Sequence, residues 1–406
     1  SADCAIGYEA ANMVLKGVQG FRDDFEEHIL RGRCTFELYQ PVPCVSLCPA
    51  GVDVPGYIAL ISEGRYKDAI RLIRKDNPMP ATCALVCEHP CETRCRRNMI
   101  DHSINIRGLK RFAVEHAGTV PVEKKAPSIG KRVAIVGAGP SGLSAAYYLS
   151  IMGYDVEIFE QRQKLGGMLR YGIPSYRLPR EVLDEEINTI LSIGIKVHKG
   201  VTIGKDFSIL DLKHNFDAIY IAIGAQTDKK IGLEGQEAKG VISAVEVLRK
   251  IGDDEYPDFT GKTVVVIGGG NVAIDVARST VRLGAKKVSI VYRRRKVDMP
   301  ALEEEVEGAI AEGCEIYDLY TPEKIVTDEN GHVKAILIKP QIVGTIRDGR
   351  PVPVEAEKET HTLECNSVII AIGQGIESKS FERDGIPVTK GAIDALNWLG
   401  IENVPG

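Results

Sequence analysis

Seven of the ten cysteines in this 406-residue chain lie between residues 34 and 95. They are Cys34, Cys44, Cys48, Cys83, Cys87, Cys91 and Cys95. The last four are each separated by three residues. The amino-terminal residues show neither the apolar core nor the cleavage site of a signal peptide. Clustered thiols in such a chain favour metal or redox chemistry over disulfides.

The spacing of these cysteines also bears on the kind of metal. Structural zinc sites prefer Cys-x2-Cys pairs, whereas iron–sulfur clusters are held by thiolates at more varied spacings. The cysteines therefore predict an iron–sulfur site. Cys314 and Cys365 stand apart from this group and are expected to be buried apolar thiols.

A glycine-rich turn follows the apolar run 133–136 and precedes a helical pattern. It reads Gly137-x-Gly139-x-x-Gly142. In such a motif the first glycine makes the turn, the second lets backbone approach a pyrophosphate, and the third packs helix on strand. Glu160 ends the next strand, where an acid binds ribose hydroxyls. The pattern predicts dinucleotide binding, and the alternative is a glycine turn without function.

A second turn of the same kind reads Gly268-x-Gly270-x-x-Ala273. Its following strand ends without an acid, and Arg293 and Arg294 stand there instead. An acid would repel a 2′-phosphate, whereas arginine can pair with one. The second motif therefore favours NADP(H) over NAD(H), and the alternative is a solvated basic turn.

The two motifs belong to a strand–helix–strand unit that recurs about 130 residues later. Two further apolar strands end in Ala-x-Gly, at Gly224 and at Gly373, and each is expected to close one of the two sheets. FAD in the first site and NADP(H) in the second is the economical interpretation. Flavin exchanges hydride with a nicotinamide and single electrons with an iron–sulfur cluster.

These patterns predict an α/β protein with a helical iron–sulfur domain followed by two Rossmann-like domains. Residues 1–118 form the helical domain, which metal binding would stabilise, and residues 119–131 a linker. Residues 132–255 begin the FAD-binding domain. Residues 256–374 form an NADPH-binding domain inserted in it, and residues 375–406 return to the FAD-binding domain.

Composition argues against two classes of partner. The net charge of −5 leaves no basic footprint for nucleic acid. No uninterrupted apolar run approaches the roughly eighteen residues of a membrane-spanning helix. We therefore expect a cytoplasmic protein with neither nucleic acid nor membrane as a partner. No Ser/His/Asp or acid–base arrangement predicts that this chain itself transforms an organic substrate.

Several segments together carry a resemblance to a known family. They are CPAGVDVPGYIALI, CALVCEHPCETRC, LGGMLRYGIPSYRLP, GGGNVAIDVAR and YRRRKVDMPA. The chain resembles the glutamate synthase small-subunit family over residues 44–406. That family includes the NADPH-binding subunit of electron-bifurcating ferredoxin:NADP oxidoreductases and the N-terminal half of dihydropyrimidine dehydrogenase. The resemblance implies a redox subunit that works with other flavoprotein or iron–sulfur subunits.

The resemblance also implies cofactor-binding positions. For the nucleotide sites it adds, to the residues given above, Pro140, Ser141, Gly166, Gly167 and Asn271. For iron it implies two [4Fe–4S] clusters, and it assigns Cys48, Cys87, Cys91 and Cys95 to one of them. His89, among these cysteines, is expected to lie next to the ligands without ligating.

The second cluster is where the sequence departs from the family. Of the family pattern C-x2-C-x4-C-x3-C-P, only Cys44 and Cys48 stand in register. Where the family often has a Glu or Gln ligand, this chain has Lys110, whose ammonium cannot ligate. Cys34, Cys44 and Cys83 remain, one ligand short of four. The expectation is therefore one [4Fe–4S] cluster, or two if another residue completes the second site.

The sequence ends just before the Gly-Asp turn that the family places near the flavin, so the flavin site as given is expected to be incomplete. Two alternatives to a bifurcating subunit stay open. One is a glutamate synthase small subunit that delivers NADPH electrons to an amidotransferase partner. The other is a non-catalytic electron-relay or scaffold chain with an empty flavin site.

Overall fold

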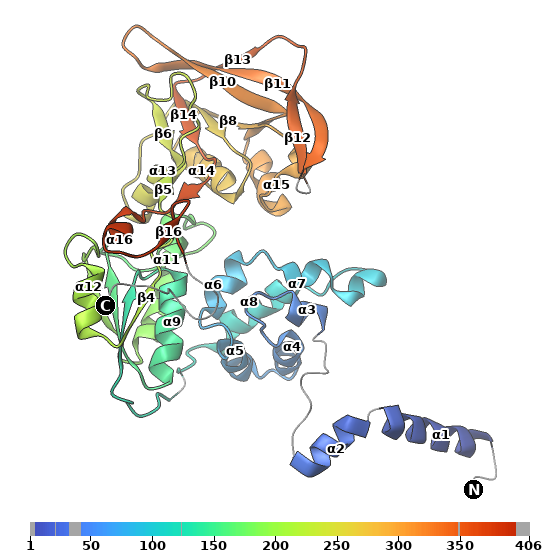
Figure 1. Ribbon diagram of the computed structural model, residues 1–406. Helices are drawn as coiled ribbons and strands as arrows, with labels where there is room; N and C mark the ends of the chain where they lie inside the picture. Colours follow the sequence, from blue (N-terminus) through green and yellow to red (C-terminus); the bar gives the residue numbers. More distant parts are fainter. Residues whose placement is uncertain (1–4, 21, 32–41, 123, 348–349, 395–406) are drawn as a thin grey trace.

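The computed structural model describes residues 5–20, 22–31, 42–122, 124–347 and 350–394 (Figure 1). Helices fill the amino-terminal part, and two parallel sheets with their covering helices follow (Figure 1). The predicted α/β fold class is confirmed. None of the helices in these ranges is long and apolar enough to cross a membrane.

The described residues of the amino-terminal part form helices joined by turns. Its helices are α1 (Ala5–Gly20), α2 (Arg22–Arg31), α3 (Pro43–Ser46), α4 (Val54–Ser62), α5 (Tyr66–Arg74), α6 (Pro80–Val86), α7 (Pro90–Thr93) and α8 (Ile106–Ala117). Proline opens α3, α6 and α7, and Asp53 caps α4 by accepting a hydrogen bond from Gly56 N. Helices α4, α5 and α8 bury a core around Tyr57, Ile73 and Ala113. Helices α1 and α2 lie apart from this core (Figure 1).

The first sheet is parallel, in the order β3-β2-β1-β4. Its strands are β1 (Arg132–Val136), β2 (Asp155–Glu160), β3 (Lys196–Lys199) and β4 (Ala218–Ile221). The helices of this unit are α9 (Pro140–Ile151), α10 (Met168–Tyr171), α11 (Arg180–Leu191) and α12 (Ile209–Asn215). Ile135, Leu143, Ile158 and Leu183 meet in its core. Strand β4 pairs with β1, which confirms that the first Ala-x-Gly strand closes this sheet.

The second sheet is also parallel, in the order β6-β14-β7-β8-β9. Its strands are β6 (Val241–Ser243), β7 (Thr263–Ile267), β8 (Lys287–Tyr292), β9 (Glu315–Asp318) and β14 (Ser367–Ile370). Its helices are α13 (Ala244–Gly252), α14 (Asn271–Arg282) and α15 (Glu303–Ala311). Strand β14, the second Ala-x-Gly strand, belongs to this sheet as expected, but it lies between β6 and β7 and does not close the sheet at its edge. Strand β6 and helix α13 precede the boundary expected at residue 256, yet they pair and pack with this sheet.

An antiparallel sheet extends the second unit. It contains β10 (Tyr320–Thr327), β11 (Val333–Arg347), β12 (Arg350–Glu355) and β13 (His361–Glu364). Between β14 and the first unit, the chain forms β15 (Gln374–Gly375), which pairs antiparallel with β5 (Thr227–Asp228). The chain then forms α16 (Lys379–Arg383), β16 (Val388–Thr389) and β17 (Ala392–Ile393). Phe381 and Ile386 pack with Val136 of the first sheet, so the second unit is an insertion in the first.

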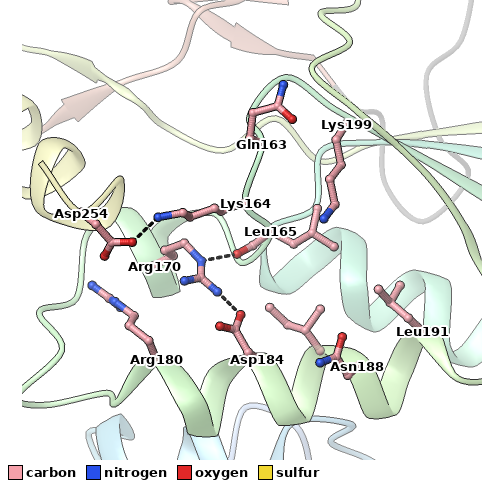
Figure 2. A pocket seen from close by; sticks show the side chains of 11 residues that line it. Gln163, Lys164, Leu165, Arg170, Arg180, Asp184, Asn188, Leu191, Lys199 and Asp254 are labelled. Atoms are coloured by element: carbon pink, nitrogen blue, oxygen red, sulfur yellow. Dashed lines mark hydrogen bonds and ion pairs between the residues drawn. The ribbon is translucent and has the colours of Figure 1, made fainter.

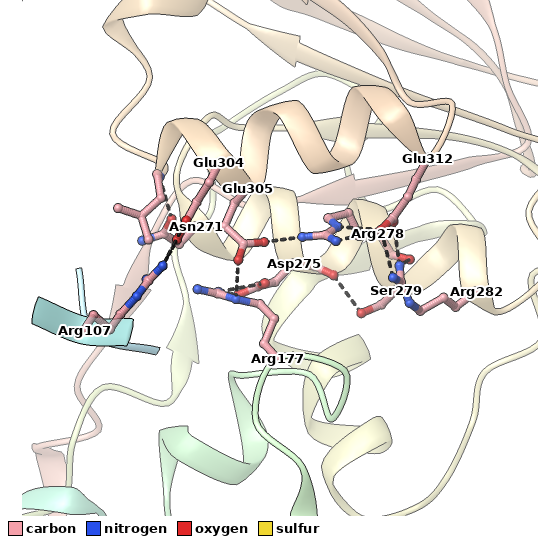
Figure 3. A network of polar contacts seen from close by, with 11 residues as sticks. Arg107, Arg177, Asn271, Asp275, Arg278, Ser279, Arg282, Glu304, Glu305 and Glu312 are labelled. Carbon is pink, nitrogen blue, oxygen red and sulfur yellow. Dashed lines mark hydrogen bonds and ion pairs between the residues drawn. The ribbon is translucent and has the colours of Figure 1, made fainter. Parts of the chain in front are cut away.

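A buried ion-pair network joins the two units (Figure 3). Arg177, in the loop between α10 and α11, pairs with Asp275 of α14 at 2.8 Å and with Glu305 of α15 at 2.9 Å. All three side chains are largely buried. The Tyr176 ring lies under the guanidinium of Arg282, 3.9 Å from its carbon to the ring centre. These contacts fix the Tyr176–Arg177 loop of the first unit on the helices of the second.

The substitution Arg177→Met should destabilise the protein markedly. It leaves the buried carboxylate of Asp275 without its ion-pair partner and leaves Glu305 with Arg278 alone. Removing one partner of a buried pair costs about 3–5 kcal/mol. The matched control is Arg71→Met, which removes an exposed pair with Asp68 that is worth about 0–1 kcal/mol. Thermal unfolding followed by circular dichroism measures both. Equal shifts in the two midpoints would contradict a structural role for the network.

Candidate nucleotide and iron–sulfur sites

The first glycine motif makes a turn that side chains would block. Gly137 has φ of 107°, and a Cβ there would lie 2.4 Å from the carbonyl oxygen of Ala222. A Cβ on Gly142 would lie 1.9 Å from the oxygen of Gly137. Helix α9 begins at Pro140, directly after the turn, so its free N–H groups and partial positive charge face this edge of the sheet.

A second loop lies against this turn. Gly167 has φ of 51°, and a Cβ there would lie 2.6 Å from the Cα of Gly139. Gly166 N donates a hydrogen bond of 2.9 Å to Ala138 O. Backbone therefore meets backbone, and two bare peptide segments border the site. Next to them, the Ser141 hydroxyl lies 2.8 Å from the hydroxyl of Tyr220 on β4.

Glu160 lies where the sequence predicts an acid for a ribose. Its carboxylate is buried at the end of β2 and accepts hydrogen bonds from Ala138 N at 2.8 Å and Arg162 N at 2.9 Å. Each oxygen keeps a lone pair that a ribose hydroxyl can use. The bare glycine turn, the helix N-terminus and this carboxylate together fit the adenosine and pyrophosphate of FAD.

A charged cavity of about 280 Å³ lies beside this loop (Figure 2). Arg170 donates a hydrogen bond of 2.7 Å to Leu165 O and pairs with Asp184 of α11. Lys164 pairs with Asp254 (Figure 2). These contacts fasten both ends of the loop that presents Gly166 and Gly167. These ion pairs explain why the loop has a defined position. They do not indicate a ligand for the cavity.

The second glycine motif repeats the geometry of the first. Gly268 has φ of 145°, and a Cβ there would lie 2.3 Å from Ala371 O. Ala371 begins the Ala-x-Gly segment that ends at Gly373, and Ala222 begins the one that ends at Gly224. In both units, then, the Ala-x-Gly segment closes against the glycine turn. The same packing rule explains why the pattern occurs twice in the sequence.

Asn271 and Ala273 follow this turn on α14. Ala273 is fully buried and replaces the third glycine of the motif. Asn271 accepts a hydrogen bond from Leu302 N at 3.0 Å and donates one of 2.8 Å to Glu88. Its side chain therefore joins the second glycine turn to the cysteine-bearing part of the chain, beyond the cofactor role that the sequence predicts.

The arginines after β8 differ in their contacts. Arg294 donates a hydrogen bond of 2.7 Å from Nε to Pro351 O, and Arg295 pairs with Asp298 at 2.7 Å. Arg293 is exposed, and among the described residues nothing forms a hydrogen bond or ion pair with it. The guanidinium of Arg293 is thus fully available to a 2′-phosphate. Arg294 could still donate to a phosphate through its two Nη atoms, because only its Nε is used by Pro351.

The cysteines of the amino-terminal part lie on and just after three short helices. Cys44 lies on α3, Cys83 on α6 and Cys91 on α7, and the turns that follow these helices carry Cys48, Cys87 and Cys95. Helix α3 packs against α7, which brings the two cysteine-bearing segments together. Cys34 lies outside the described residues.

Burial and neighbouring charges raise the pKa values of several of these thiols. Burial raises the pKa of Cys91 to about 11, and the charges of Glu92, Cys87 and Cys48 act in the same direction. Burial also raises the pKa of Cys44, with a smaller contribution from Cys95. A thiol must lose its proton to ligate iron, so cluster binding has to offset these raised pKa values.

Two further features suit an iron–sulfur cluster. His89 adopts a left-handed backbone with φ of 43°, and its N–H donates a hydrogen bond to the sulfur of Cys87 at 3.3 Å. Its ring atom Nδ1 is buried without a hydrogen-bond partner. In the described ranges no three His, Cys, Asp or Glu side chains come close enough to hold one metal ion.

The structure identifies residues that the motifs alone did not. Arg177 and Glu88 lie inside the quoted segments, but only the fold shows that they contact Asp275 and Asn271. Cys314 and Cys365 are buried as expected, and burial raises their pKa to about 11 and about 12. The expected return to the flavin site beyond residue 394 lies outside the described residues.

Two family models match the chain. One, pyridine nucleotide-disulphide oxidoreductase, matches residues 131–405. The other, dihydropyrimidine dehydrogenase domain II with a 4Fe-4S cluster, matches residues 30–120. These matches confirm the cofactors expected from the sequence, which are FAD and NADP(H) in the two sheets and a [4Fe–4S] cluster in the helical part.

Individual relatives agree with these models. The chain is 38% identical to NADPH-Fe(3+) oxidoreductase subunit beta of Geobacter sulfurreducens, over 99% of this chain and 62% of that one. It is 31% identical to the glutamate synthase [NADPH] small chain of Escherichia coli, over 81% of this chain and 73% of that one. It thus spans less than two thirds of the first of these two relatives.

A solved structure shows the same fold. Mycobacterium tuberculosis FprA in complex with NADPH matches with a TM-score of 0.56 at 21% identity, over 67% of this chain and 77% of that one. At this identity the likeness supports the arrangement of the two sheets and nothing finer.

If Cys91 ligates a cluster, as the sequence predicts, the substitution Cys91→Ser should remove that cluster. Iron should fall by about four atoms per chain, or the helical part should unfold, because cluster binding is also folding energy. Cys314→Ser, which changes a buried thiol of the second sheet unit, is the control and should keep its iron. Iron analysis after anaerobic purification measures both, and one equivalent of zinc without iron would contradict the cluster.

The same iron analysis decides the number of clusters in the wild-type protein. Two clusters require about eight iron atoms per chain and one cluster requires about four. The departure at Lys110 favours the lower number, because only three cysteines then remain for a second site. A value near eight would show that a further residue completes it.

Proposed function

This chain belongs to the pyridine nucleotide-disulphide oxidoreductase family, and from that premise we propose that it is an NADP(H)-dependent subunit of a larger redox complex. It would exchange hydride between NADP(H) and FAD and pass single electrons through its [4Fe–4S] cluster to or from a partner subunit. The observation that carries the proposal is the meeting of three sites. The cysteine segment touches the second glycine motif through Glu88 and Asn271, and the flavin-side loop touches the same helix through Arg177 and Asp275.

The residues of this chain bind and position, and the cofactors supply the chemistry. FAD accepts a hydride and releases electrons singly, which suits it to connect a nicotinamide with an iron–sulfur cluster. The bare turns at Gly139 and Gly167 allow backbone to approach a pyrophosphate, and Glu160 holds the ribose end. The Arg177 network keeps the two nucleotide sites at a fixed separation, which hydride transfer requires.

We further propose the division into a helical iron–sulfur domain, an FAD-binding domain and an inserted NADPH-binding domain. The crossing strands β5 and β15 support the insertion, and the place of β6 in the second sheet supports a start near residue 241. The cysteines Cys44, Cys48, Cys83, Cys87, Cys91 and Cys95, with Cys34, stay the proposed iron ligands.

The setting we propose is an electron-bifurcating complex. A flavin that meets both a nicotinamide and an iron–sulfur cluster has the two connections that such a reaction uses. The name of the Geobacter sulfurreducens relative, a subunit beta, supports a multi-subunit setting. Composition of the intact complex, purified without air, tests this setting, and a second flavoprotein is the expected partner.

A glutamate synthase small subunit is the second candidate. The 31% identity to the Escherichia coli small chain over 73% of that chain favours it. An amidotransferase-like partner in the purified complex would support this candidate over bifurcation. A non-catalytic relay would instead lack the structured visible absorption of bound flavin in the isolated chain.

Nucleotide choice gives a sharper test. We expect Arg293→Ser combined with Arg294→Ser to weaken NADPH binding about tenfold to hundredfold, because a charge-assisted contact to phosphate is worth about 1.5–3 kcal/mol. NADH binding and flavin content should stay unchanged, because NADH has no 2′-phosphate. Stopped-flow reduction of the flavin by each nucleotide measures the effect.

Arg295→Ser is the matched control, since Arg295 already pairs with Asp298. It should leave the preference for NADPH intact. Arg293→Ser alone should carry most of the effect, because Arg294 is held at Pro351. Equal reduction of the wild-type protein by NADH and NADPH would refute the NADP assignment.

A further inference from the structure

Lys110 on α8 is a buried cation of an unusual kind. Only 8% of its surface is exposed, and its ammonium lies 5.9 Å from the centre of the Tyr57 ring. Within the part of the chain that the structure describes, no hydrogen bond or ion pair reaches it. Tyr57 packs in one core with Cys91, Cys44 and Cys48, and helix α8 packs against α6, which carries Cys83.

Two other buried cations among the described residues have carboxylate partners. Arg170 pairs with Asp184, and Arg177 pairs with Asp275 and Glu305. A buried charge without a partner is costly, since neither water nor a counter-ion stabilises it. Lys110 is therefore expected to meet negative charge of another origin.

Among the residues that the structure describes, the elements around Lys110 offer one such origin. Helix α8 packs against α4, α5 and α6. Glu92, the carboxylate next to Cys91, already accepts a hydrogen bond of 2.8 Å from Arg107 N. Glu186, a buried carboxylate on the far side of α6, accepts hydrogen bonds from Ala81 N and Thr82 N. Among the described residues, the groups left near Lys110 are the thiols, and they become negative when they ligate iron. The counter-charge then arrives with the cluster itself.

We propose that Lys110 is the internal counter-cation of the iron–sulfur cluster, which raises the cluster's reduction potential without ligating iron. The inference rests on the proposed function, which places a cluster among these cysteines. Reduction adds one electron, and hence one negative charge, without making or breaking a bond. A fixed positive charge nearby stabilises the reduced form more than the oxidised form. The electron comes from the reduced flavin of the same chain.

Neutral and charged replacements test the role of this charge. Lys110→Met removes the ammonium and keeps an unbranched side chain, whereas Lys110→Arg keeps a positive charge. The control Arg111→Met removes the adjacent charge on the same helix, which is exposed and pairs with Glu115 at 2.7 Å. Each protein is purified without air and titrated with dithionite and redox mediators while electron paramagnetic resonance follows the reduced cluster.

In Lys110→Met the ratio of reduced to oxidised cluster at a given solution potential should fall at least tenfold. This corresponds to a decrease of about 59 mV in the midpoint potential for one electron. Lys110→Arg and Arg111→Met should stay close to the wild type. An unchanged midpoint in Lys110→Met with full iron content overturns the proposal. An equal fall in Lys110→Arg also overturns it, because packing would then explain the effect.

Loss of the cluster in a variant is also informative. Lys110→Leu is a second neutral replacement, without an atom that can ligate iron, and gives the same comparison if Lys110→Met binds no iron. If both neutral variants lose the cluster while Lys110→Arg keeps it, the need for a counter-charge is supported. If Lys110→Arg loses it as well, the proposal fails. A wild-type protein without any cluster signal would instead refute the proposed function, so the two failures are distinguishable.

Discussion

The pairing of Arg177 with Asp275 and Glu305 is the interaction on which the arrangement of the two nucleotide sites depends. The chain passes between the two parallel sheets at only two places in the described structure, and β5 and β15 pair there over two residues each. Such a short connection restrains little by itself. The buried carboxylates repel one another unless the guanidinium stays between them, so separating the units would expose that cost. The network thus fixes the position of one nucleotide site relative to the other.

Buried or partly buried charged side chains also hold the cysteine-bearing helices against the two sheet units. Glu186 of α11 is buried and accepts hydrogen bonds from Ala81 N at 2.6 Å and Thr82 N at 2.9 Å, at the start of α6. A carboxylate at a helix N-terminus satisfies free N–H groups and complements the helix dipole. On the other side, Arg107 pairs with Glu304 of α15 at 2.8 Å. The helical part is therefore fastened to both sheet units, which brings the cysteines to the border between them.

The sequence predicts what local geometry dictates. The glycine turns at Gly137 and Gly268 follow from sterics within a few residues, and the apolar strands beside them follow from burial on both faces. The α/β class and the duplicated unit could therefore be derived before the structure. The contact of Glu88 with Asn271 joins residues 183 positions apart, and no local pattern encodes it. Arg294 has a hydrogen-bond partner and Arg293 has none among the described residues. This difference also depends on a distant element, because β12 brings Pro351 O to Arg294.

The number of clusters could not be predicted from the sequence for a related reason. A cysteine spacing specifies which thiols a short segment can present, but ligation also depends on the charge that surrounds them. Lys110 shows this, because the motif treats it as a missing ligand while its burial among thiols makes it part of their electrostatic environment. A position that loses a ligating oxygen and gains an ammonium changes the net charge of the site as well as its donor set. Loss of one ligand and tuning of a neighbouring cluster can thus follow from a single residue.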